Sequence, residues 1–402
     1  MSTTRQHACN SQTRASTRPL EGILVVSLEH AVAGPFCTRQ LADLGARVIK
    51  IERPGNGDFA RAYDSRVKGQ SSHFVWTNRS KESLTLDLKD PAQLDALKTI
   101  VAKADVLVQN LAPGAASRMG LSFDALHAKL PRLIVCDISG YGNDGPYRDK
   151  KAYDLLIQAE AGLISVTGTS ATPCKAGSSI ADIAAGMYAY SSILTAILQR
   201  HRTGQGGHID VSMLEALAEW MNYPMYYAYE DAPPPPRTAA SHASIYPYGP
   251  LATKDGIVIF GIQNDREWAV FCENVLGTPT LASDPRFNTN VQRNKNRAEL
   301  DAHILEVFQS LSTEQVETRL DEAQIANGRM NDMAGLWSHP QLHSRNRWRK
   351  VASPAGEIPA LLPPGRHSSF EYRMDLIPAP GEHTRAILSE FGLTLPRGLN
   401  PA

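Results

Sequence analysis

Two aspartates lie at the start of apolar helical patterns, Asp154 in "KAYDLLIQAEAGL" and Asp182 in "SSIADIAAGMYAY". Ionised carboxylates are rarely buried without a partner, and the plainest interpretation of both is helix N-capping. Capping is compatible with chemistry, because a helix N-terminus stabilises a carboxylate in its charged, nucleophilic form. Apolar surroundings also exclude water from a reactive acyl intermediate. The pattern therefore allows a carboxylate nucleophile, with structural capping as the alternative.

Basic side chains that could contact an anionic small molecule are dispersed along the chain. Taken singly, each is interpreted as a solvated surface charge. Several nevertheless fall at strand-to-helix junctions, where open α/β sheets bind ligands. The residues are Arg53, Arg79, Lys81, Lys89, Arg118, Arg148, Lys150 and Lys151.

The elements that must position these residues alternate between strand and helix. Short β-branched runs predict strands at 22–28, 47–52, 83–88, 105–111 and 207–213, and another at the start of 131–142. Helical spacing over 34–46, 90–104 and 214–222 falls between or after them. Alternation of this kind predicts an α/β fold with a doubly wound, parallel, Rossmann-like sheet.

The pattern breaks at 223–250, where Pro233–Pro236 form a stiff connector. A smaller α+β region is expected next, with a strand at 256–262 and helices near 265–276, 296–310 and 313–324. From about 330 the chain is expected to be loop-like until a last helix at 381–392. The predicted domains are a disordered tail (1–19), a large α/β domain (20–225), a small α+β domain with linkers (226–330) and a C-terminal return to the large domain (331–402).

Composition excludes several classes of function. The 41 basic and 41 acidic residues cancel, so no charge field indicates nucleic acid or an anionic membrane as a partner. Five cysteines without CxxC spacing fit a reducing cytoplasm. The uncharged run 183–199 is interpreted as a buried core helix. The polar N-terminus is not a secretory signal, and an organelle transit peptide stays an alternative to a plain tail.

Motifs for other chemistries are missing. The turn after the first strand, "EHAVAGPF", has no GxGxxG, so Glu52 at the end of the second strand is not expected to hold the ribose of a nicotinamide cofactor. There is no GxSxG elbow for a serine hydrolase. His339 and His343 in "HPQLH" are interpreted as a surface loop, and no metal site is expected.

Taken together, the motifs resemble the family III CoA-transferases, which include formyl-CoA transferase and carnitine CoA-transferase and share their fold with α-methylacyl-CoA racemase. The resemblance covers about residues 20 to 395. It rests on "AVAGPFCTRQLADLGARVIKIERPGNGD", "NRSKESLTLDLK", "VQNLAPGAASRMGL", "SGYGNDGPYRDKKAYDLLIQAEAGL", "RTGQGGHIDVSMLEA" and "GEHT". It implies CoA thioesters and small carboxylic acids as substrates, no prosthetic group, and an interlocked homodimer.

The resemblance also implies roles for single residues. The family nucleophile falls on Asp182, and Asp154, with Tyr153 beside it, falls on an auxiliary acid that orients or supports. CoA contacts fall on Val32, Ala33, Arg53, Leu86, Lys89, Asn110, Leu111, Arg118, Met119 and Lys151.

Departures from the family pattern narrow the reaction. Val32 replaces the Gln that guards the oxalyl intermediate in formyl-CoA transferase, and Tyr153 replaces the catalytic His of the racemase. The lid region "TAASHASIYPYGP" lacks the glycine run of formyl-CoA transferase. The similarity is greater to members that pass CoA from succinyl-CoA to dicarboxylates such as itaconate, mesaconate, citramalate or hydroxymethylglutarate. We expect His242, with Arg237 or Ser244, to bind the distal carboxylate.

A carboxylate nucleophile suits transfer between acids of similar energy, because its anhydride and thioester intermediates stay reactive. The rival interpretations are an α-methylacyl-CoA racemase, a formyl-CoA- or carnitine-type transferase, and a CoA-binding protein without catalysis.

Overall fold

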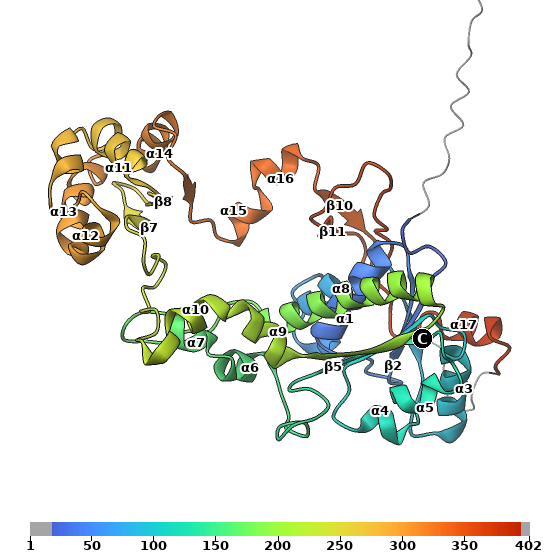
Figure 1. Ribbon diagram of the computed structural model, residues 1–402. Coiled ribbons are helices and arrows are strands. Elements are labelled where there is room, and N and C mark those ends of the chain that lie inside the picture. Colours follow the sequence, from blue (N-terminus) through green and yellow to red (C-terminus); the bar gives the residue numbers. More distant parts are fainter. Residues whose placement is uncertain (1–17, 395–402) are drawn as a thin grey trace, which may run out of the picture. The chain divides into compact units, whose positions relative to one another are not determined.

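The computed structural model describes residues 18–394 (Figure 1). The predicted tail at 1–19 lies outside the described residues except for its last two. The chain forms two compact units. The first contains the chain up to Ile157, Ser179–Leu217 and the chain from Arg347 onward, and the second contains Gln158–Ser178 and Ala218–Asn346. The domain limits predicted at 225 and 330 both fall inside the second unit. The division of the chain into separate domains at these limits stays a prediction.

A six-stranded parallel sheet forms the centre of the first unit. Its strands are β1 (Leu24–Leu28), β2 (Arg47–Glu52), β3 (Lys81–Thr85), β4 (Val106–Gln109), β5 (Ile134–Ser139) and β6 (Gly207–Ser212). They lie in the order β3-β2-β1-β4-β5-β6. The predicted doubly wound parallel sheet is therefore confirmed. The order reverses between β1 and β4, which places the ligand-binding crevice of such a sheet beyond the carboxyl ends of these strands.

Helices cover both faces of the sheet. On one face α1 (Ala33–Asp43) packs against α8 (Ile180–Thr203), and α8 also lies on β5 and β6 (Figure 1). On the other face α3 (Pro91–Val101), α5 (Phe123–His127) and α17 (Thr384–Glu390) bury side chains against Val26, Leu28 and their neighbours. Shorter elements complete this unit: η1 (Phe59–Ala62), α2 (Ser72–Thr77), α4 (Ala115–Arg118), α6 (Asp154–Glu160) and α9 (Met213–Trp220), of which the last two run on into the second unit.

Helix α8 has the length and hydropathy of a membrane span, as core helices of soluble proteins also do. Its buried residues include Ala181, Ala185, Ala189 and Ile193. These residues recur at the helical period and therefore form one face of α8, which packs on α1 and the sheet.

The second unit contains a three-stranded antiparallel sheet of β7 (Tyr248–Ala252), β8 (Ile257–Gly261) and β9 (Asn327–Arg329). Its helices include α7 (Leu163–Val166), α10 (Asn222–Tyr227), α12 (Asn290–Lys295), α13 (Arg297–Phe308) and α14 (Thr313–Glu322). The predicted helix at 265–276 is α11 (Asp265–Val270) followed by a π-helical turn at Phe271–Val275. Phe260, Trp268, Phe271 and Phe308 form an aromatic core.

The region expected to be loop-like from about 330 is more regular than predicted. It contains α15 (Met333–Trp337), α16 (Pro340–Ser344) and a hairpin of β10 (Trp348–Val351) and β11 (Ile358–Leu361). The predicted surface loop at His339 and His343 is wrong. The Nδ1 atom of His339 caps α16 by accepting from the N–H of Gln341 at 3.2 Å, and His343 pairs with the carbonyl of Trp337.

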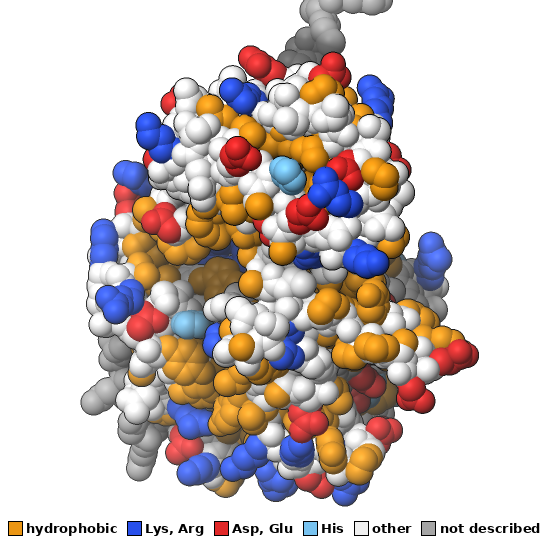
Figure 2. Space-filling model, turned by 90° about the vertical axis from the view of Figure 1, so that its left-hand side faces the viewer, with side chains coloured by type: hydrophobic (Ala, Val, Ile, Leu, Met, Phe, Trp, Pro, Cys, Tyr) orange, Lys and Arg blue, Asp and Glu red, His pale blue; other side chains and the backbone are white. Residues whose placement is uncertain are grey.

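Charged side chains of both signs are interspersed on the face drawn in Figure 2. In the part of the chain from 18 to 394, no group of three or more His, Cys, Asp and Glu side chains is arranged to hold a metal ion.

Candidate active site

Asp182 is the third residue of α8, in its first turn. Ser179 precedes the helix and its side chain makes no capping bond, so the interpretation of Asp182 as an N-cap is wrong. The backbone N–H of Ala33, the first residue of α1, is instead close enough to the Asp182 carboxylate to lower its pKa. The amino-terminal ends of two long helices therefore meet at one carboxylate, where both helix dipoles favour negative charge.

Asp154 provides the cap that Asp182 does not. Its Oδ1 atom accepts from the N–H of Ala181 at 2.8 Å and from the N–H of Asp182 at 3.3 Å. Asp154 is itself the first residue of α6. It therefore caps a helix as predicted, and that helix is α8. The bonds fix the first turn of α8, on which Asp182 is carried.

The electrostatics of Asp182 are those of a half-buried acid without a counter-charge. Burial, helped by the charge of Asp154, raises the pKa of this carboxyl from 3.8 to about 7, although the backbone N–H of Ala33 acts to lower it. Among residues 18–394, no Lys or Arg forms an ion pair with Asp182. Strongly perturbed acids of this kind concentrate at functional sites. The ionised form is poorly solvated and therefore suited to attack an electrophile.

Gly186 allows α1 and α8 to approach closely. A Cβ atom at this position would lie 2.8 Å from the carbonyl oxygen of Ala33 and 3.0 Å from the ring of Phe36. Gly186 is four residues after Asp182, so both lie on the same face of α8. The absence of a side chain therefore lets the start of α1 reach the Asp182 carboxylate. Sequence reasoning missed this residue, although a glycine inside a helical pattern was the available signal.

A buried ion-pair network holds the loop that leads into α1. The Nζ of Lys50 lies 2.8 Å from Asp58 and 3.4 Å from Glu29, and the Nζ of Lys81 lies 2.7 Å from Glu29. Asp58 also accepts from the N–H of Ala31, whose φ is 62°. Burial by itself would raise the pKa of Glu29, but the two lysines outweigh burial and lower it. The network fixes the strained turn that aims the start of α1.

Two basic residues that the sequence suggested were solvated are in fact buried. Lys81 is 2% exposed, and Arg79 is 4% exposed and forms an ion pair with Asp43 at 2.7 Å. Their partners come from distant parts of the sequence, which charge patterns alone do not show.

Glu52 is also buried, and side chains of the interior bind its carboxylate. Its carboxylate accepts from Arg61 at 2.7 and 2.8 Å and from the hydroxyl of Ser83 at 2.6 Å. Burial would raise its pKa, but the Arg61 hydrogen bonds and the charge of Lys50 lower it to about 2. Glu52 is thus a structural anion and has no free oxygen facing a ribose.

The positions implied for CoA contact follow the carboxyl ends of successive strands. Val32 and Ala33 come after β1, Arg53 after β2, Leu86 and Lys89 after β3, and Asn110, Leu111, Arg118 and Met119 after β4; Lys151 lies in the segment between β5 and α6. The parallel sheet therefore brings the first nine to one edge.

These positions differ in exposure. Arg53, Lys89, Arg118 and Lys151 are exposed, whereas Val32, Ala33 and Leu86 are buried. The amide of Asn110 accepts from the N–H of His30 at 2.8 Å and donates to its carbonyl at 2.9 Å. Asn110 thereby braces the turn before α1.

An aromatic cluster near Asp182 was not predicted. His30 stacks on Phe59, Phe59 contacts Tyr63, and Tyr63 meets His73 edge-on at 5.3 Å. The pKa of Tyr63 is raised to about 12. Burial is the main cause, and the charges of Asp58, Asp182 and Tyr153 act in the same direction. Tyr63 therefore lies within electrostatic reach of Asp182. Tyr153, predicted as polar support, is 69% exposed.

The residues predicted to bind the distal carboxylate lie in the second unit and differ in availability. Each side-chain nitrogen of Arg237 donates to a backbone carbonyl, of Ser165, Thr169 or Ser170, at 2.9 to 3.1 Å. His242 and its neighbour Ser241 line a cavity of about 270 Å³.

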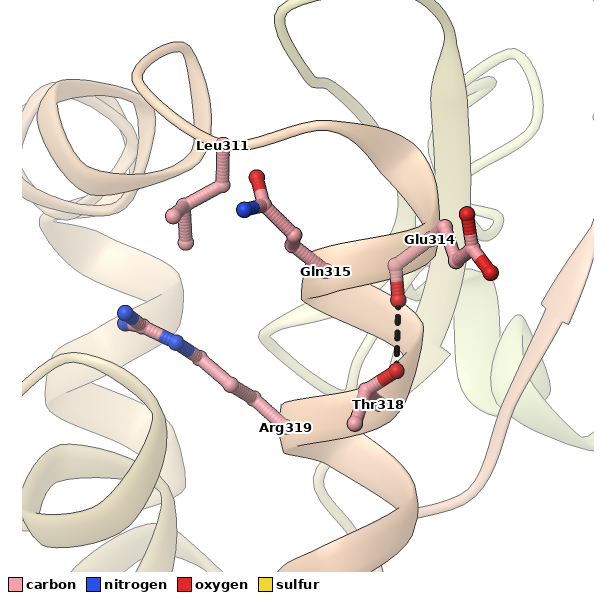
Figure 3. Close-up of a pocket in the computed structure, with 5 residues that line it drawn as sticks. All are labelled: Leu311, Glu314, Gln315, Thr318 and Arg319. Atoms are coloured by element: carbon pink, nitrogen blue, oxygen red, sulfur yellow. Dashed lines mark hydrogen bonds between the residues drawn. The ribbon is translucent and has the colours of Figure 1, made fainter.

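A further cavity, of about 370 Å³, lies at α14 (Figure 3). Gln315 and Arg319 point toward Leu311, whereas Glu314 points away, and the hydroxyl of Thr318 donates to the carbonyl of Glu314 at 2.8 Å (Figure 3). Arg319 donates to the carbonyl of Val275. Its one acid, Glu314, is exposed and points away, so this cavity is not the candidate active site.

Comparison with known proteins decides the family. Residues 20–384 match CoA-transferase family III. The chain belongs to this family. It is 34% identical over 380 residues to the succinyl-CoA:glutarate CoA-transferase of Mus musculus, covering 93% of this chain and 87% of the relative. It is 33% identical to the succinyl-CoA–D-citramalate CoA-transferase of Chloroflexus aurantiacus, covering 94% of this chain and 95% of the relative.

The fold agrees with this family. A crystal structure of a CaiB/BaiF family protein from Brucella suis superposes with a TM-score of 0.83 at 32% identity, covering 93% of this chain and 100% of that one. The predicted membership and fold class are confirmed. The protein is a CoA-transferase of family III, and its relatives include enzymes that act on succinyl-CoA and dicarboxylates.

Proposed function

We propose that this enzyme transfers CoA from succinyl-CoA to a small dicarboxylate by covalent catalysis on Asp182. The observation that carries the proposal is the Asp182 carboxylate itself: desolvated, without a cationic partner, and aimed at by the start of α1. The names of two relatives support the donor and the class of acceptor. Glutarate is the acceptor that we would test first, followed by citramalate, mesaconate and itaconate.

The chemistry balances without a cofactor and without net proton transfer. The Asp182 carboxylate attacks the thioester carbonyl of succinyl-CoA, the C–S bond breaks and CoA departs as a thiolate, which leaves a mixed anhydride of Asp182 and succinate. The thiolate attacks the aspartyl carbonyl and releases succinate, which leaves an aspartyl-CoA thioester. The incoming dicarboxylate attacks that thioester, and the thiolate then attacks the acceptor's carbonyl in the second anhydride. The products are the new acyl-CoA and the free Asp182 carboxylate.

Residues around Asp182 support these steps. Backbone N–H groups at the first turns of α1 and α8 are fixed donors of the kind that stabilise a developing oxyanion. Asp154 holds the first turn of α8 in place through its bonds to Ala181 and Asp182. Tyr153 is proposed as polar support. Exposed Arg53, Lys89, Arg118 and Lys151 are proposed to contact the phosphates and other polar groups of CoA.

Further parts of the proposal concern assembly and location. We propose a homodimer that works in the cytoplasm with CoA thioesters as substrates and no prosthetic group. Tyr153 in place of a histidine base disfavours the racemase alternative, because that reaction needs bases on both sides of the α-carbon. Deuterium exchange at the α-carbon of an acyl-CoA without an acceptor acid would favour the racemase instead.

The test is the rate of CoA transfer from succinyl-CoA to glutarate in Asp182→Ala. We expect the rate to fall by at least about 10⁴-fold while CoA binding measured by calorimetry is retained, because the nucleophile alone is lost. Asp95→Asn, on the exposed face of α3, is the matched control and should retain full activity. Transfer that survives in Asp182→Ala would end the assignment of the nucleophile.

A further inference from the structure

Three polar side chains on neighbouring strands of the parallel sheet form a hydrogen-bonded chain, which we call the cross-strand network. Asp137 of β5 accepts from the side-chain amide of Gln109, the last residue of β4, at 2.9 Å through its Oδ1 atom. Its Oδ2 atom lies 2.8 Å from the Nε2 atom of His208 on β6. An ionised carboxylate only accepts hydrogen bonds, so Nε2 of His208 carries a hydrogen and Gln109 presents its NH2 group to Asp137.

The orientation of the Gln109 amide decides what its oxygen binds. Because the NH2 group faces Asp137, the Oε1 atom faces the backbone N–H of Leu111 and accepts from it at 2.8 Å. An amide turned the other way would place its NH2 group against that N–H, and two donors cannot bond to each other. The carboxylate of Asp137 therefore fixes the first turn of the chain after β4.

His208 completes the network from the edge strand β6. Its ring stacks on Phe123 of α5, with centroids 5.1 Å apart and planes 11° apart. The hydrogen bond to Asp137 is the main cause of a raised pKa of His208. Asp137 is buried, and among residues 18–394 only His208 forms an ion pair with it. A buried carboxylate needs partners for its oxygens, and Gln109 and His208 supply one for each.

The turn that begins at Leu111 is continuous with α4. The N–H of Ala115 donates to the carbonyl of Ala112 at 3.0 Å, and the N–H of Arg118 donates to the carbonyl of Gly114 at 3.1 Å. A Cβ atom on Gly114 would lie 2.9 Å from the Nη1 atom of Arg118, so the guanidinium lies against this turn. The position of the Arg118 side chain thus depends on the conformation that starts at Leu111.

The segment from Asn110 to Arg118 lies where a sheet of this kind binds its ligand. The strand order reverses between β1 and β4, so the crevice opens beyond the carboxyl ends of these two strands. The segment directly follows β4. CoA is the group that family III enzymes transfer, and the exposed guanidinium of Arg118 is a suitable donor for its phosphates.

We propose that the cross-strand network sets the affinity of the enzyme for the CoA moiety by fixing the segment from Asn110 to Arg118. Gln109, Asp137 and His208 are positioning residues, since they act through the backbone N–H of Leu111 without touching the substrate. The inference rests on the proposed function, in which this edge of the sheet binds CoA. It deepens that function by naming the residues that hold the binding segment in place.

The first test reverses the charge pattern at one end of the network. Gln109→Glu keeps an acceptor for the N–H of Leu111 but sets a second carboxylate against Asp137. We expect the Kd of CoA, measured by calorimetry, and the KM for succinyl-CoA to rise roughly 10- to 100-fold, as for loss of a hydrogen bond to a charged group. The kcat should change less than about threefold, because the reacting groups at Asp182 are not altered.

The decisive variant combines Gln109→Glu with Asp137→Asn. The new amide at position 137 donates to the new carboxylate at position 109 and still accepts from His208, so the net charge and the bonds are kept with one donor reversed. The Kd and the KM should return to within about threefold of wild type. Gln315→Glu is the matched control, because the Oε1 atom of Gln315 also accepts from a backbone N–H, that of Ser312, at 2.9 Å. It should leave both constants unchanged.

A separate pair of variants tests His208. His208→Gln keeps an N–H donor for Asp137, and we expect the Kd of CoA to stay within about threefold of wild type. His208→Leu removes the donor, and the Kd should rise roughly 10-fold. Equal Kd values in the two variants would remove His208 from the network.

The remaining outcomes separate the inference from the proposed function. A Kd of CoA that stays within about twofold of wild type in Gln109→Glu overturns the inference. A double variant that fails to fold, or that binds CoA no better than Gln109→Glu, overturns it as well. A wild-type enzyme that binds CoA but transfers it to no dicarboxylate contradicts the proposed function and leaves the comparison of Kd values intact.

Discussion

Two sets of desolvated carboxylates near the start of α1 differ in the charged groups that surround them. Glu29 and Asp58 are paired with Lys50 and Lys81, and the lysines lower the pKa of Glu29 despite complete burial. Asp182 is also desolvated, but no Lys or Arg among residues 18–394 forms an ion pair with it, and its pKa is raised to about 7. Burial disfavours charge at both places. At Glu29 the two lysines, with the hydroxyl of Thr38, outweigh burial and lower the pKa, whereas at Asp182 the charge of Asp154 adds to the effect of burial.

The difference separates a structural acid from a reactive one. The paired acids fix the turn at Ala31 and stabilise the fold only as a complete set. The unpaired acid destabilises the fold when it is ionised, and that cost is the source of its reactivity. Sites that carry chemistry commonly reduce stability in this way.

The largest expected effect comes from breaking the paired group. Glu29→Gln removes the anion shared by Lys50 and Lys81 and leaves buried positive charge uncompensated. We expect the free energy of unfolding to fall by about 3–5 kcal/mol, measured by urea denaturation at pH 7. Glu390→Gln, which removes an exposed partner of Arg47, should cost less than about 1 kcal/mol. Equal losses in the two variants would show that the network is no more than a set of ordinary surface pairs.

Neutralising the unpaired acid, Asp182, is expected to raise the free energy of unfolding rather than lower it. The folded-state pKa of Asp182 is raised from 3.8 to about 7, so stability is lost as pH rises through this range and the loss is complete above it. Asp182→Asn removes this penalty, and we expect the free energy of unfolding to rise at pH 8 on the order of 2–4 kcal/mol. The gain should shrink toward zero as pH falls to about 4. A variant that is less stable than wild type at pH 8 would contradict the unpaired state of this carboxylate.

A smaller effect is expected from moving α1 away from Asp182. Gly186→Ala improves helix propensity by about 1 kcal/mol but places Cβ 2.8 Å from the carbonyl oxygen of Ala33. We expect kcat to fall roughly 10- to 100-fold while KM for succinyl-CoA changes less than about threefold. Gly207→Ala is the control, since a Cβ there meets no atom within 4 Å. An unaltered kcat in Gly186→Ala would show that the contact between Ala33 and Asp182 is not needed.

The smallest effect is a shift of the pH profile. Asp154→Asn keeps an oxygen that can cap Ala181 and Asp182, but it removes the charge that raises the pKa of Asp182. The acid limb of kcat/KM for succinyl-CoA should therefore move to lower pH. We expect the ratio of the rate at pH 6 to that at pH 8 to rise about two- to threefold. A ratio that stays the same or falls would mean that Asp154 carries no charge that Asp182 senses.

The sequence predicts local elements better than the contacts between them. β2 has the predicted limits 47–52, because its buried run is bounded by Gly45 and Pro54. β3 begins at Lys81 rather than 83 because that lysine is buried against Glu29, which lies 52 residues earlier. Hydrophobic patterning does not show a charge that becomes buried through a distant partner. For the same reason, the role of Gly186 and the aromatic cluster at Tyr63 became visible only in the structure.

The site residues followed from the resemblance rather than from spacing. Asp182 and Asp154 were singled out by their place before apolar helices, but local patterning could only suggest capping for each. The structure shows that Asp154 caps the helix that carries Asp182, over 27 residues of sequence. Arg237 is the opposite case. The sequence suggested it as a substrate-binding residue, but in the fold its side-chain nitrogens donate to backbone carbonyls.

The most direct test of covalent catalysis is to trap the intermediate. The enzyme is incubated with succinyl-CoA in the absence of an acceptor acid, treated with borohydride or hydroxylamine, and digested for peptide mass spectrometry. Our account predicts a modification on Asp182 that depends on succinyl-CoA and is absent from Asp182→Asn. A modification on another residue, or full turnover with an unmodified Asp182, would contradict it.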